Sequence, residues 1–163
     1  MKQLILVRHA NSPIQFVKFK DFDRPLSSLG ESDAKLMVGQ LLNKKIIIDH
    51  IISSDANRAF STSKIIAENI NFNVSSIKID NAIYRSSEKY MIDIIKKFSD
   101  QYNTVMITGH NPTFHYLSQI LSNEIYPNFP PCAMCCIQFE VNSWIDIYEG
   151  KKQFMIYPEL FKD

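Results

Sequence analysis

Short apolar runs recur along the chain, and several of them end in polar or charged residues. Leu4–Val7 is a continuous apolar run, which predicts a strand buried on both faces of a sheet. Arg8 and His9 follow this run directly, so the pattern places a cation and an imidazole at the carboxyl end of the strand. Further short apolar runs predict strands at residues 51–52, 77–79 and 104–108.

Between these runs, apolar residues recur at helical spacing. A loop of about fifteen residues that contains Pro13 and Pro25 follows the first strand, and loops of that length usually serve a function. Ser27 or Ser28 can cap the helix after it, which we expect to cover one face of the sheet. The apolar stripe of this helix consists of Leu29, Ala34, Met37, Val38, Leu41 and Leu42.

The next helices begin at polar residues that can cap them. Asp55 is the predicted cap of a helix that carries Arg58 in its first turn, and one of the serines 86–87 is the predicted cap of the next. A fourth helix follows Gly109-His110-Asn111-Pro112, with the asparagine as cap and the proline at the first helical position. The apolar faces of the second and third helices consist of Ala59, Ile65, Ile66, Ile70, Met91, Ile94, Ile95 and Phe98.

The last part of the chain has a different pattern. Prolines at 127, 130 and 131 end the fourth helix, and residues 133–141 and 153–157 predict two strands added antiparallel at a sheet edge. Three alternations of strand and helix with short connections precede them. We therefore predict one domain over residues 1–163 with an α/β fold: a three-layer α/β/α sandwich with a mainly parallel central sheet and antiparallel C-terminal edge strands.

Composition and charge exclude several classes of protein. The 163 residues are 45% hydrophobic, which is typical of a globular domain. The formal net charge of +1 gives no overall attraction to nucleic acid or to an anionic membrane. No apolar run reaches the length of a membrane span and Met1-Lys2 leads directly into a strand, so we expect a cytoplasmic protein without nucleic acid or membrane partners.

The three cysteines, Cys132, Cys135 and Cys136, are clustered near the end of the chain. No second group of Cys or His accompanies them in the sequence to complete a metal site. We expect them to be free thiols, buried or half-buried, and expect no metal.

Four groups that can bind anions follow the carboxyl ends of predicted strands. Arg8 and His9 follow the first strand, Arg58 comes after the strand that ends near residue 53, and His110 follows the strand at 104–108. Parallel strands bring these ends to one edge of the sheet, where ligands of such sheets bind. One histidine near a strand end is more often structural than catalytic, but two guanidinium groups and two imidazoles together predict a pocket for a phosphoryl group.

His9 is the candidate nucleophile of this pocket. A neutral imidazole can attack phosphorus and carry the phosphoryl group, and nearby cations disfavour the protonated ring. A backbone carbonyl could hold the proton of the other ring nitrogen. His110 can donate to a phosphoryl oxygen, and with Arg8 and Arg58 it would stabilise charge in the transition state.

Three sequence blocks resemble the signatures of the histidine phosphatase superfamily. Arg8-His9-Ala10 is similar to the family's Arg-His-Gly at the end of the first strand, and Gly109-His110 is similar to its Gly-His before a helix. The chain's short length, its Arg-His-Ala and the segment Asp23–Gly30 further resemble the SixA-type branch, the phosphohistidine phosphatases. The resemblance covers residues 3–121. The family's Ser-(three residues)-Arg-Ala-(two residues)-Thr is matched by Ser54, Arg58, Ala59 and Thr62.

This resemblance implies a phosphoglycerate mutase-like fold and a covalent phosphohistidine intermediate on His9. It implies that Arg8, Arg58 and His110 form the phosphate pocket, and it implies no metal or organic cofactor. The partners it implies are phosphate ion and either a phosphorylated protein of the histidine phosphotransfer type or a small phosphorylated substrate.

The sequence departs from the family at the general acid. Many relatives carry an acidic residue just after a tyrosine ahead of the third helix, whereas Tyr84 is followed here by Arg85. Glu88, Asp21 or Asp23 could take the role of acid. Alternatively, the reaction could need less acid catalysis, because an imidazole leaving group can take up a proton before it departs.

Three further residues each have two interpretations. Asn11 could hydrogen-bond the phosphoryl group or serve only as a turn residue. Arg24 could contact an anion at the rim of the pocket or form a salt bridge with one of the loop's aspartates. Arg85 could bind phosphate or an acidic partner, or be a solvated surface residue. His50 and His115 match no motif, and we assign them to structure.

The leading hypothesis is a phosphatase that acts on phosphohistidine of a phosphotransfer protein. About fifty residues separate Arg58 from His110 and the predicted elements use most of them, so little chain remains for a lid. An open pocket favours a substrate carried by another protein. The alternatives are a phosphomonoesterase for a small phosphorylated metabolite and a binding module that holds a phosphorylated partner without turning it over.

Overall fold

Six strands form one mixed sheet in the spatial order β3-β2-β4-β1-β5-β6. The computed structural model describes residues 1–14 and 18–163, and the part of the predicted loop at residues 15–17 lies outside the described residues. The strands are β1 (Lys2–Arg8), β2 (His50–Ser53), β3 (Lys78–Ile79), β4 (Thr104–Gly109), β5 (Met134–Phe139) and β6 (Lys151–Ile156).

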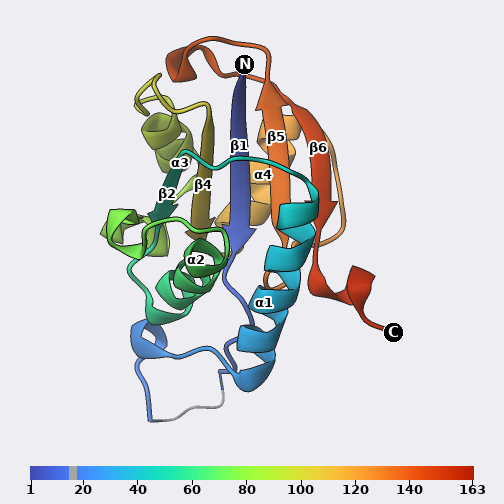
Figure 1. Ribbon diagram of the computed structural model, residues 1–163. Helices are drawn as coiled ribbons and strands as arrows, with labels where there is room; N and C mark the ends of the chain where they lie inside the picture. The colour runs from blue at the N-terminus through green and yellow to red at the C-terminus, as the bar shows by residue number, and fades with distance from the viewer. Residues whose placement is uncertain (15–17) are drawn as a thin grey trace.

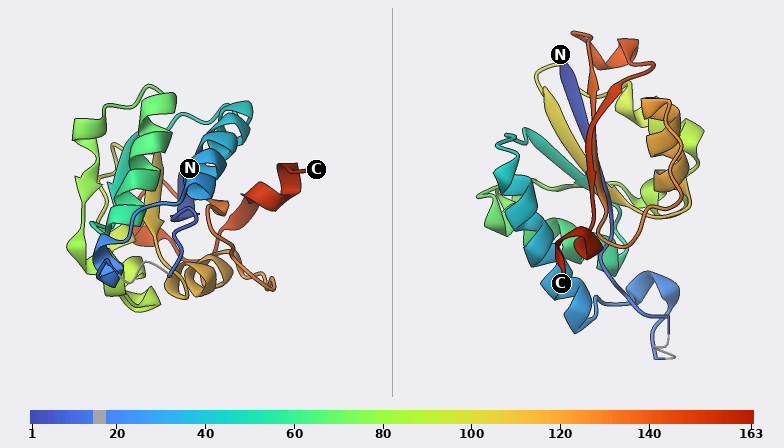
Figure 2. Two further views of the ribbon diagram at one scale, coloured as in Figure 1. Left: turned by 90° about the horizontal axis from the view of Figure 1, so that it is seen from below. Right: turned by 90° about the vertical axis from the view of Figure 1, so that its right-hand side faces the viewer.

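Helices cover both faces of the sheet (Figures 1 and 2). The α-helices are α1 (Ser28–Asn43), α2 (Asn57–Asn69), α3 (Glu88–Ile95) and α4 (Thr113–Ser122). Helices α1 and α2 lie on one face and α3 and α4 on the other, which confirms the predicted three-layer α/β/α fold. Short 3₁₀-helical turns lie at Asp21–Asp23, Val74–Ser76, Asn81–Arg85, Trp144–Asp146 and Pro158–Phe161.

The register of the sheet brings three strand ends to one level. β1 and β2 both pair parallel with β4, so that Arg8 lies opposite Gly109 and Ser53 lies opposite Thr108. β5 pairs antiparallel with β1 and β6 pairs antiparallel with β5, as the sequence predicted. The residues that follow β1, β2 and β4 therefore leave the sheet side by side.

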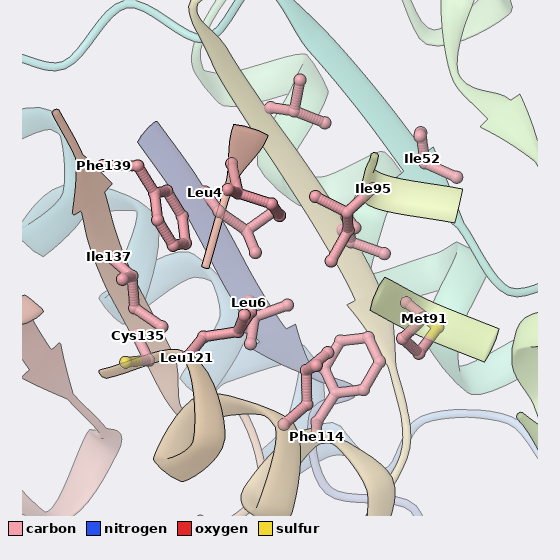
Figure 3. Close-up of a cluster of buried hydrophobic side chains, with 14 of the residues drawn as sticks. Leu4, Leu6, Ile52, Met91, Ile95, Phe114, Leu121, Cys135, Ile137 and Phe139 are labelled. Atoms are coloured by element: carbon pink, nitrogen blue, oxygen red, sulfur yellow. The ribbon is translucent and has the colours of Figure 1, made fainter. Parts of the chain in front are cut away.

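β1 is buried on both faces, and its side chains alternate between two cores. Leu4 and Leu6 belong to the core under α3 and α4, which Figure 3 shows in close-up. Ile5 and Val7 belong to the core under α1 and α2. Burial of each side chain contributes roughly 1.5–3 kcal/mol, so the two cores fix the position of the strand that delivers Arg8 and His9.

The predicted apolar stripe of α1 is wrong at its two ends. Leu29 and Leu42 are 52% and 53% exposed. Residues one position along a helix are rotated by about 100°, and the buried face runs through Gly30, Ala34, Met37 and Leu41. Leu29 and Leu42 therefore lie on the flank of the helix.

Two of the predicted helix caps are confirmed. The Ser27 hydroxyl accepts a hydrogen bond from the backbone N–H of Gly30 at 3.0 Å, and the Ser87 hydroxyl accepts one from Tyr90 at 3.2 Å. These contacts satisfy N–H groups in the first turns of α1 and α3 that have no partner within the helix.

Two other predicted caps are wrong. Helix α2 begins at Asn57 without a side-chain cap, because the Ser54 hydroxyl takes the Ala56 N–H where Asp55 was expected to cap. Helix α4 begins at Thr113, after Pro112 rather than with it. The amide of Asn111 instead donates to the carbonyl of Phe129 at 2.9 Å.

The three cysteines are free and buried, as expected. Burial raises the pKa of Cys132 and Cys136 to about 12 and that of Cys135 to about 11, so all three are neutral thiols. Across residues 1–14 and 18–163, no group of three His, Cys, Asp or Glu side chains could hold a metal ion. No helix in the same residues is long and apolar enough to cross a bilayer.

Candidate active site

Backbone hydrogen bonds continue past the strand ends and place the next residues side by side. The N–H of His9 donates to the carbonyl of Gly109 at 3.1 Å, and the N–H of Ser54 donates to the carbonyl of Thr108 at 3.0 Å. His9, Ser54 and His110 therefore leave β1, β2 and β4 at one level, and Arg58 in the first turn of α2 contacts His9.

The ring of His9 has a defined proton position. Its Nδ1 lies 2.8 Å from the carbonyl oxygen of Ala10, which can only accept. The proton of the neutral ring is therefore on Nδ1, and Nε2 keeps its lone pair. Arg58 Nε donates to that Nε2 at 3.2 Å. The carbonyl expected from the sequence is thus that of Ala10.

His9 and His110 are close, buried and neutral. Their ring centroids are 5.3 Å apart and each residue is 8% exposed. The pKa of His110 is lowered to about 4, first by burial and next by the charge of Arg58. Burial also lowers the pKa of His9 to about 3, with smaller contributions from His110, Arg58 and Arg8.

Arg8 and Arg58 supply two cations to the same site. Arg8 donates through Nη1 to the carbonyl of Phe129 at 3.0 Å, and its buried Nε has no partner among the described residues. Burial and then the charge of Arg58 lower the pKa of Arg8. An anion between the two guanidinium groups would relieve both their repulsion and the unpaired donor.

A carboxylate from the first loop already contacts Arg58. Asp21 Oδ2 lies 3.2 Å from Arg58 Nη2, and the Asp21 carbonyl accepts from Nη1 at 2.6 Å. The Tyr84 hydroxyl donates to the same carboxylate, and this bond is the first cause that lowers the pKa of Asp21 to about 2. Asp21 is therefore ionised and lies at the mouth of the site, with its side chain 57% exposed.

Arg24 adopts the salt bridge that the sequence offered as one of its two interpretations. Its Nη2 lies 3.0 Å from Asp21 Oδ1, and Nη1 donates to the carbonyl of Ser12. The guanidinium is buried, and its charge is one of the causes that lower the pKa of His110. Arg24 is therefore near the site and paired within the loop.

Other sequence candidates lie outside this group. The Asn11 side-chain oxygen accepts from the Ser27 hydroxyl at 2.7 Å, so this oxygen is bonded within the loop. Arg85 lies over the ring of Tyr84 at 5.4 Å and is exposed. Within the described residues, no hydrogen bond or ion pair joins Glu88 or the Asp23 carboxylate to His9, Arg58 or His110.

Two hydroxyl groups support the site and were not given a role from the sequence. Thr62 Oγ1 accepts from the Ala10 N–H at 3.0 Å and donates to the Arg58 carbonyl at 2.7 Å. Ser54 Oγ lies 2.9 Å from His110 Nε2. Both residues belong to the second sequence block, so the block's spacing could have identified them as site residues. The spacing does not show which atoms their hydroxyl groups contact.

Tyr84 is a third residue that the sequence did not place in the site. The edge of its ring packs against His110, with centroids 5.4 Å apart. Its only sequence signal was its place before Arg85. The completed arrangement is a cationic pocket around a neutral imidazole whose unprotonated Nε2 faces Arg58, which suits attack on a phosphoryl group once the substrate takes the place of that contact.

Comparisons with known proteins all point to one family. The model of the histidine phosphatase superfamily (branch 1) matches residues 4–83. An uncharacterized chloroplastic protein of Arabidopsis thaliana is 30% identical over 156 residues, which cover 90% of this chain and 71% of the relative.

Solved structures share the fold at low sequence identity. The protein histidine phosphatase SixA in complex with tungstate superposes with a TM-score of 0.84 at 21% identity, covering 98% of this chain and 99% of that one. SixA from Agrobacterium tumefaciens gives 0.82 at 20%, covering 96% and 98%. A mycobacterial glucosyl-3-phosphoglycerate phosphatase gives 0.71 at 12%, covering 97% and 99%.

These matches agree with the three sequence blocks and with the phosphoglycerate mutase-like sandwich described above. The chain belongs to the histidine phosphatase superfamily and is an enzyme of the phosphatase type.

Proposed function

We propose that the protein removes the phosphoryl group from phosphohistidine on a phosphotransfer protein, through a covalent intermediate on His9. The observation that carries this proposal is the state of the His9 ring. Its Nδ1 proton is held by the Ala10 carbonyl, and its Nε2 lone pair faces Arg58 at 3.2 Å in a pocket of cations.

The reaction has two displacements at phosphorus. First, the Nε2 lone pair of His9 forms a bond to phosphorus while the bond from phosphorus to the substrate's imidazole nitrogen breaks. The leaving imidazole departs neutral, because it carries a proton on its other ring nitrogen. Then a water oxygen bonds to phosphorus, the bond to His9 breaks, and the water's proton leaves with the phosphate.

The arginines and His110 act on the charge of the phosphoryl oxygens. Arg8 has a buried N–H donor that no described residue accepts, and Arg58 donates through Nη2 to the Asp21 carboxylate and through Nη1 to the Asp21 carbonyl. An entering phosphoryl group takes over these donors and displaces that carboxylate. The phosphoryl group of the substrate is therefore the anion that accepts from these N–H donors.

The state of Asp21 supports a substrate with a good leaving group. Its pKa of about 2 leaves it ionised before the substrate enters, so it brings no proton of its own to the reaction. An alkoxide leaving group needs such a proton, whereas an imidazole that is already protonated does not. Phosphohistidine is therefore favoured over a simple phosphate ester.

The elements between Arg58 and His110 support a substrate borne by another protein. Helix α2, the short strand β3, helix α3 and strand β4 occupy this segment, and all belong to the sheet or its cover. Little of this segment is therefore left to form a lid, and a site without a lid favours a substrate that another domain carries. The protein in the tungstate complex is described as a protein histidine phosphatase, and tungstate resembles phosphate in shape and charge. We also propose that residues 1–163 act as a single domain in the cytoplasm.

A rapid-quench experiment tests the covalent step. Incubation with a phosphorylated histidine-containing protein should trap a phosphoryl group on the enzyme that is labile in acid, stable in base and mapped to His9. A base-labile acyl phosphate would contradict the mechanism. His9→Ala should abolish turnover but still bind inorganic phosphate, whereas the control His115→Ala, on α4 and bonded to the Tyr126 carbonyl, should turn over normally.

A comparison of substrates tests the substrate class. The value of kcat/KM for a phosphorylated histidine-containing protein should exceed that for simple phosphate esters and sugar phosphates. A clear preference for the esters would contradict the proposal and favour the metabolite phosphatase. Binding of the phosphorylated protein without turnover would favour a binding module.

A further inference from the structure

Ser54 is a fully buried residue that contacts His110, and nothing in the preceding mechanism uses it. It lies between β2 and α2 and is 0% exposed. Its hydroxyl oxygen lies 2.9 Å from His110 Nε2 and 3.2 Å from the backbone nitrogen of Ala56. These two contacts determine where the protons of the group lie.

The Ala56 N–H can only donate, so it occupies one lone pair of the Ser54 oxygen. The hydroxyl proton then needs an acceptor of its own. Full burial removes solvent as that acceptor, and among the described residues His110 Nε2 is the acceptor within hydrogen-bond distance. Ser54 therefore donates to Nε2, and Nε2 is the nitrogen with the lone pair.

A neutral imidazole has one N–H group, so the proton of His110 is on Nδ1. The low pKa of His110, about 4, keeps the ring neutral at physiological pH. Nδ1 is buried and has no hydrogen-bond partner among the described residues. A buried N–H without an acceptor is unfavourable, so the site is short of one acceptor when no ligand is bound.

We infer that Ser54 is a positioning residue that fixes His110 as the Nδ1–H tautomer, so that His110 offers an N–H donor to an anion's oxygen. The oxygen it fits belongs to a tetrahedral anion of the phosphate type, because the charges of Arg58 and Arg8 both act on His110. The catalytic consequence rests on the proposed function, whereas the tautomer does not.

The two histidines then share one tautomer and use it in opposite ways. His9 donates a hydrogen bond from Nδ1–H to the Ala10 carbonyl, and its unprotonated Nε2 is the atom that attacks phosphorus. His110 has its Nε2 lone pair occupied by Ser54 and keeps the Nδ1 proton for an oxyanion. The second nitrogen differs between the rings, because Nε2 of His9 accepts from Arg58, whereas Nδ1 of His110 has no partner among the described residues.

Nuclear magnetic resonance of the protein labelled with ¹⁵N-histidine tests the tautomer directly. Near neutral pH, Nδ1 of His110 should resonate as a protonated nitrogen and Nε2 as an unprotonated one. Addition of inorganic phosphate or tungstate should shift the Nδ1 resonance of His110 more than its Nε2 resonance. A proton on Nε2 in the unligated protein would overturn the inference whatever the activity.

Ser54→Ala tests the source of the preference, and Ser53→Ala is its matched control. Ser53 is also 0% exposed, but its hydroxyl donates to the Ser54 carbonyl and does not contact His110. Ser54→Ala should give a mixture of His110 tautomers and lower kcat by about 10- to 100-fold, the usual effect of losing a group that orients an imidazole. Ser53→Ala should keep one tautomer, and Ser54→Thr should restore it.

The outcomes separate this inference from the proposed function. If the wild-type spectrum shows the Nδ1–H tautomer but no phosphorylated substrate is turned over, the inference stands and the proposed function fails. If Ser54→Ala keeps the wild-type tautomer, the inference fails even when turnover of phosphohistidine is demonstrated. If Ser54→Ala does not fold, the wild-type spectrum and its response to phosphate decide alone.

Discussion

β1 carries a cation at each end, buried at Lys2 and half-buried at Arg8, and the two ends differ in how those cations are paired. At the amino end, Lys2 is 2% exposed and its ammonium donates to the carbonyls of Asp100 and Tyr102 at 2.6 and 2.9 Å and to Asn103 Oδ1 at 3.3 Å. The ammonium also lies 5.8 Å from the centre of the Trp144 ring.

At the carboxyl end, Arg8 donates to the carbonyl of Phe129, and its buried Nε has no partner among the described residues. An ammonium has three donors, and those of Lys2 all have acceptors; a guanidinium has five, and Arg8 leaves most of them for a ligand. A cation whose N–H donors are all paired stabilises the fold. A cation with unpaired N–H donors can bind an anion.

Arg58→Met should give the largest change at the carboxyl end of β1. Loss of this guanidinium should cost about 2–4 kcal/mol in the transition state, or roughly 30- to 1,000-fold in kcat/KM. The free energy of unfolding should change less than the activity, because loss of the Arg58 bonds to His9 and Asp21 is offset by relief of the repulsion between Arg58 and Arg8. Kinetics of the purified variant and urea denaturation measure the two effects. Unchanged kinetics would remove Arg58 from the site.

Acid should destabilise the protein through His9 and His110, the two histidines of the candidate site. The pKa values of His9 and His110 are lowered to about 3 and about 4 in the folded state, against about 6.5 in the unfolded chain. The unfolded chain therefore binds more protons as the pH falls below 6.5, and stability should fall by on the order of a few kcal/mol by pH 4. Urea denaturation as a function of pH measures this loss.

The contribution of the two site histidines can be separated from that of His50. Burial lowers the pKa of His50 as well, so it adds to the same loss. His50→Gln should keep most of the pH dependence between 6.5 and 4, and the double variant His9→Gln, His110→Gln should remove most of it. The opposite result would place the acid-sensitive groups away from the site.

Lys2→Met should show the reverse pattern to Arg58→Met. It leaves two carbonyls and the Asn103 oxygen without their donor, so unfolding should become easier by about 1–3 kcal/mol, with kcat/KM unchanged. Lys151→Met, on an exposed lysine at the start of β6, is the control and should change stability by less than about 0.5 kcal/mol. A loss of activity in folded Lys2→Met would contradict the division between the two ends.

Asp21→Asn should give the smallest effect. The variant removes the carboxylate that faces Arg58, so inorganic phosphate should bind about 3- to 10-fold more tightly at low salt, and less so at high salt. Asp23→Asn in the same loop is the control, since only its backbone carbonyl is in contact with α2, through Asn57. Equal affinities for the two variants would show that Asp21 does not compete with phosphate.

Much of this fold follows from the periodicity of apolar residues. The runs in β1 and β4 are buried on both faces, and so their sequence pattern predicts their position without further knowledge. The candidate site follows from the order of strand ends, because parallel pairing brings Arg8 and His110 together. The predicted stripe of α1 failed where a leucine lay on the flank of the helix, since hydrophobicity alone does not give its angular limits.

The contacts of single polar atoms did not follow from the sequence. Asp55 and Ser54 are both able to cap a helix, and only the backbone path after β2 selects the serine for Ala56. Asp21 and Asp23 are equivalent in composition, but the short 3₁₀ turn directs one carboxylate to Arg58 and the other away from it. Which of two neighbouring polar residues makes the contact therefore depends on a shift of one residue in a turn.

The loop that carries Asp21 leaves and rejoins the fold at one point. The Ser27 N–H donates to the Asn11 carbonyl at 3.0 Å, and Gly30 packs so closely there that an added Cβ would lie 2.2 Å from the same oxygen. This closure uses backbone atoms and a glycine, so it does not depend on residues 12–26. The sequence of the loop that carries Asp21 and Arg24 can therefore change while Asn11 and Ser27 stay joined.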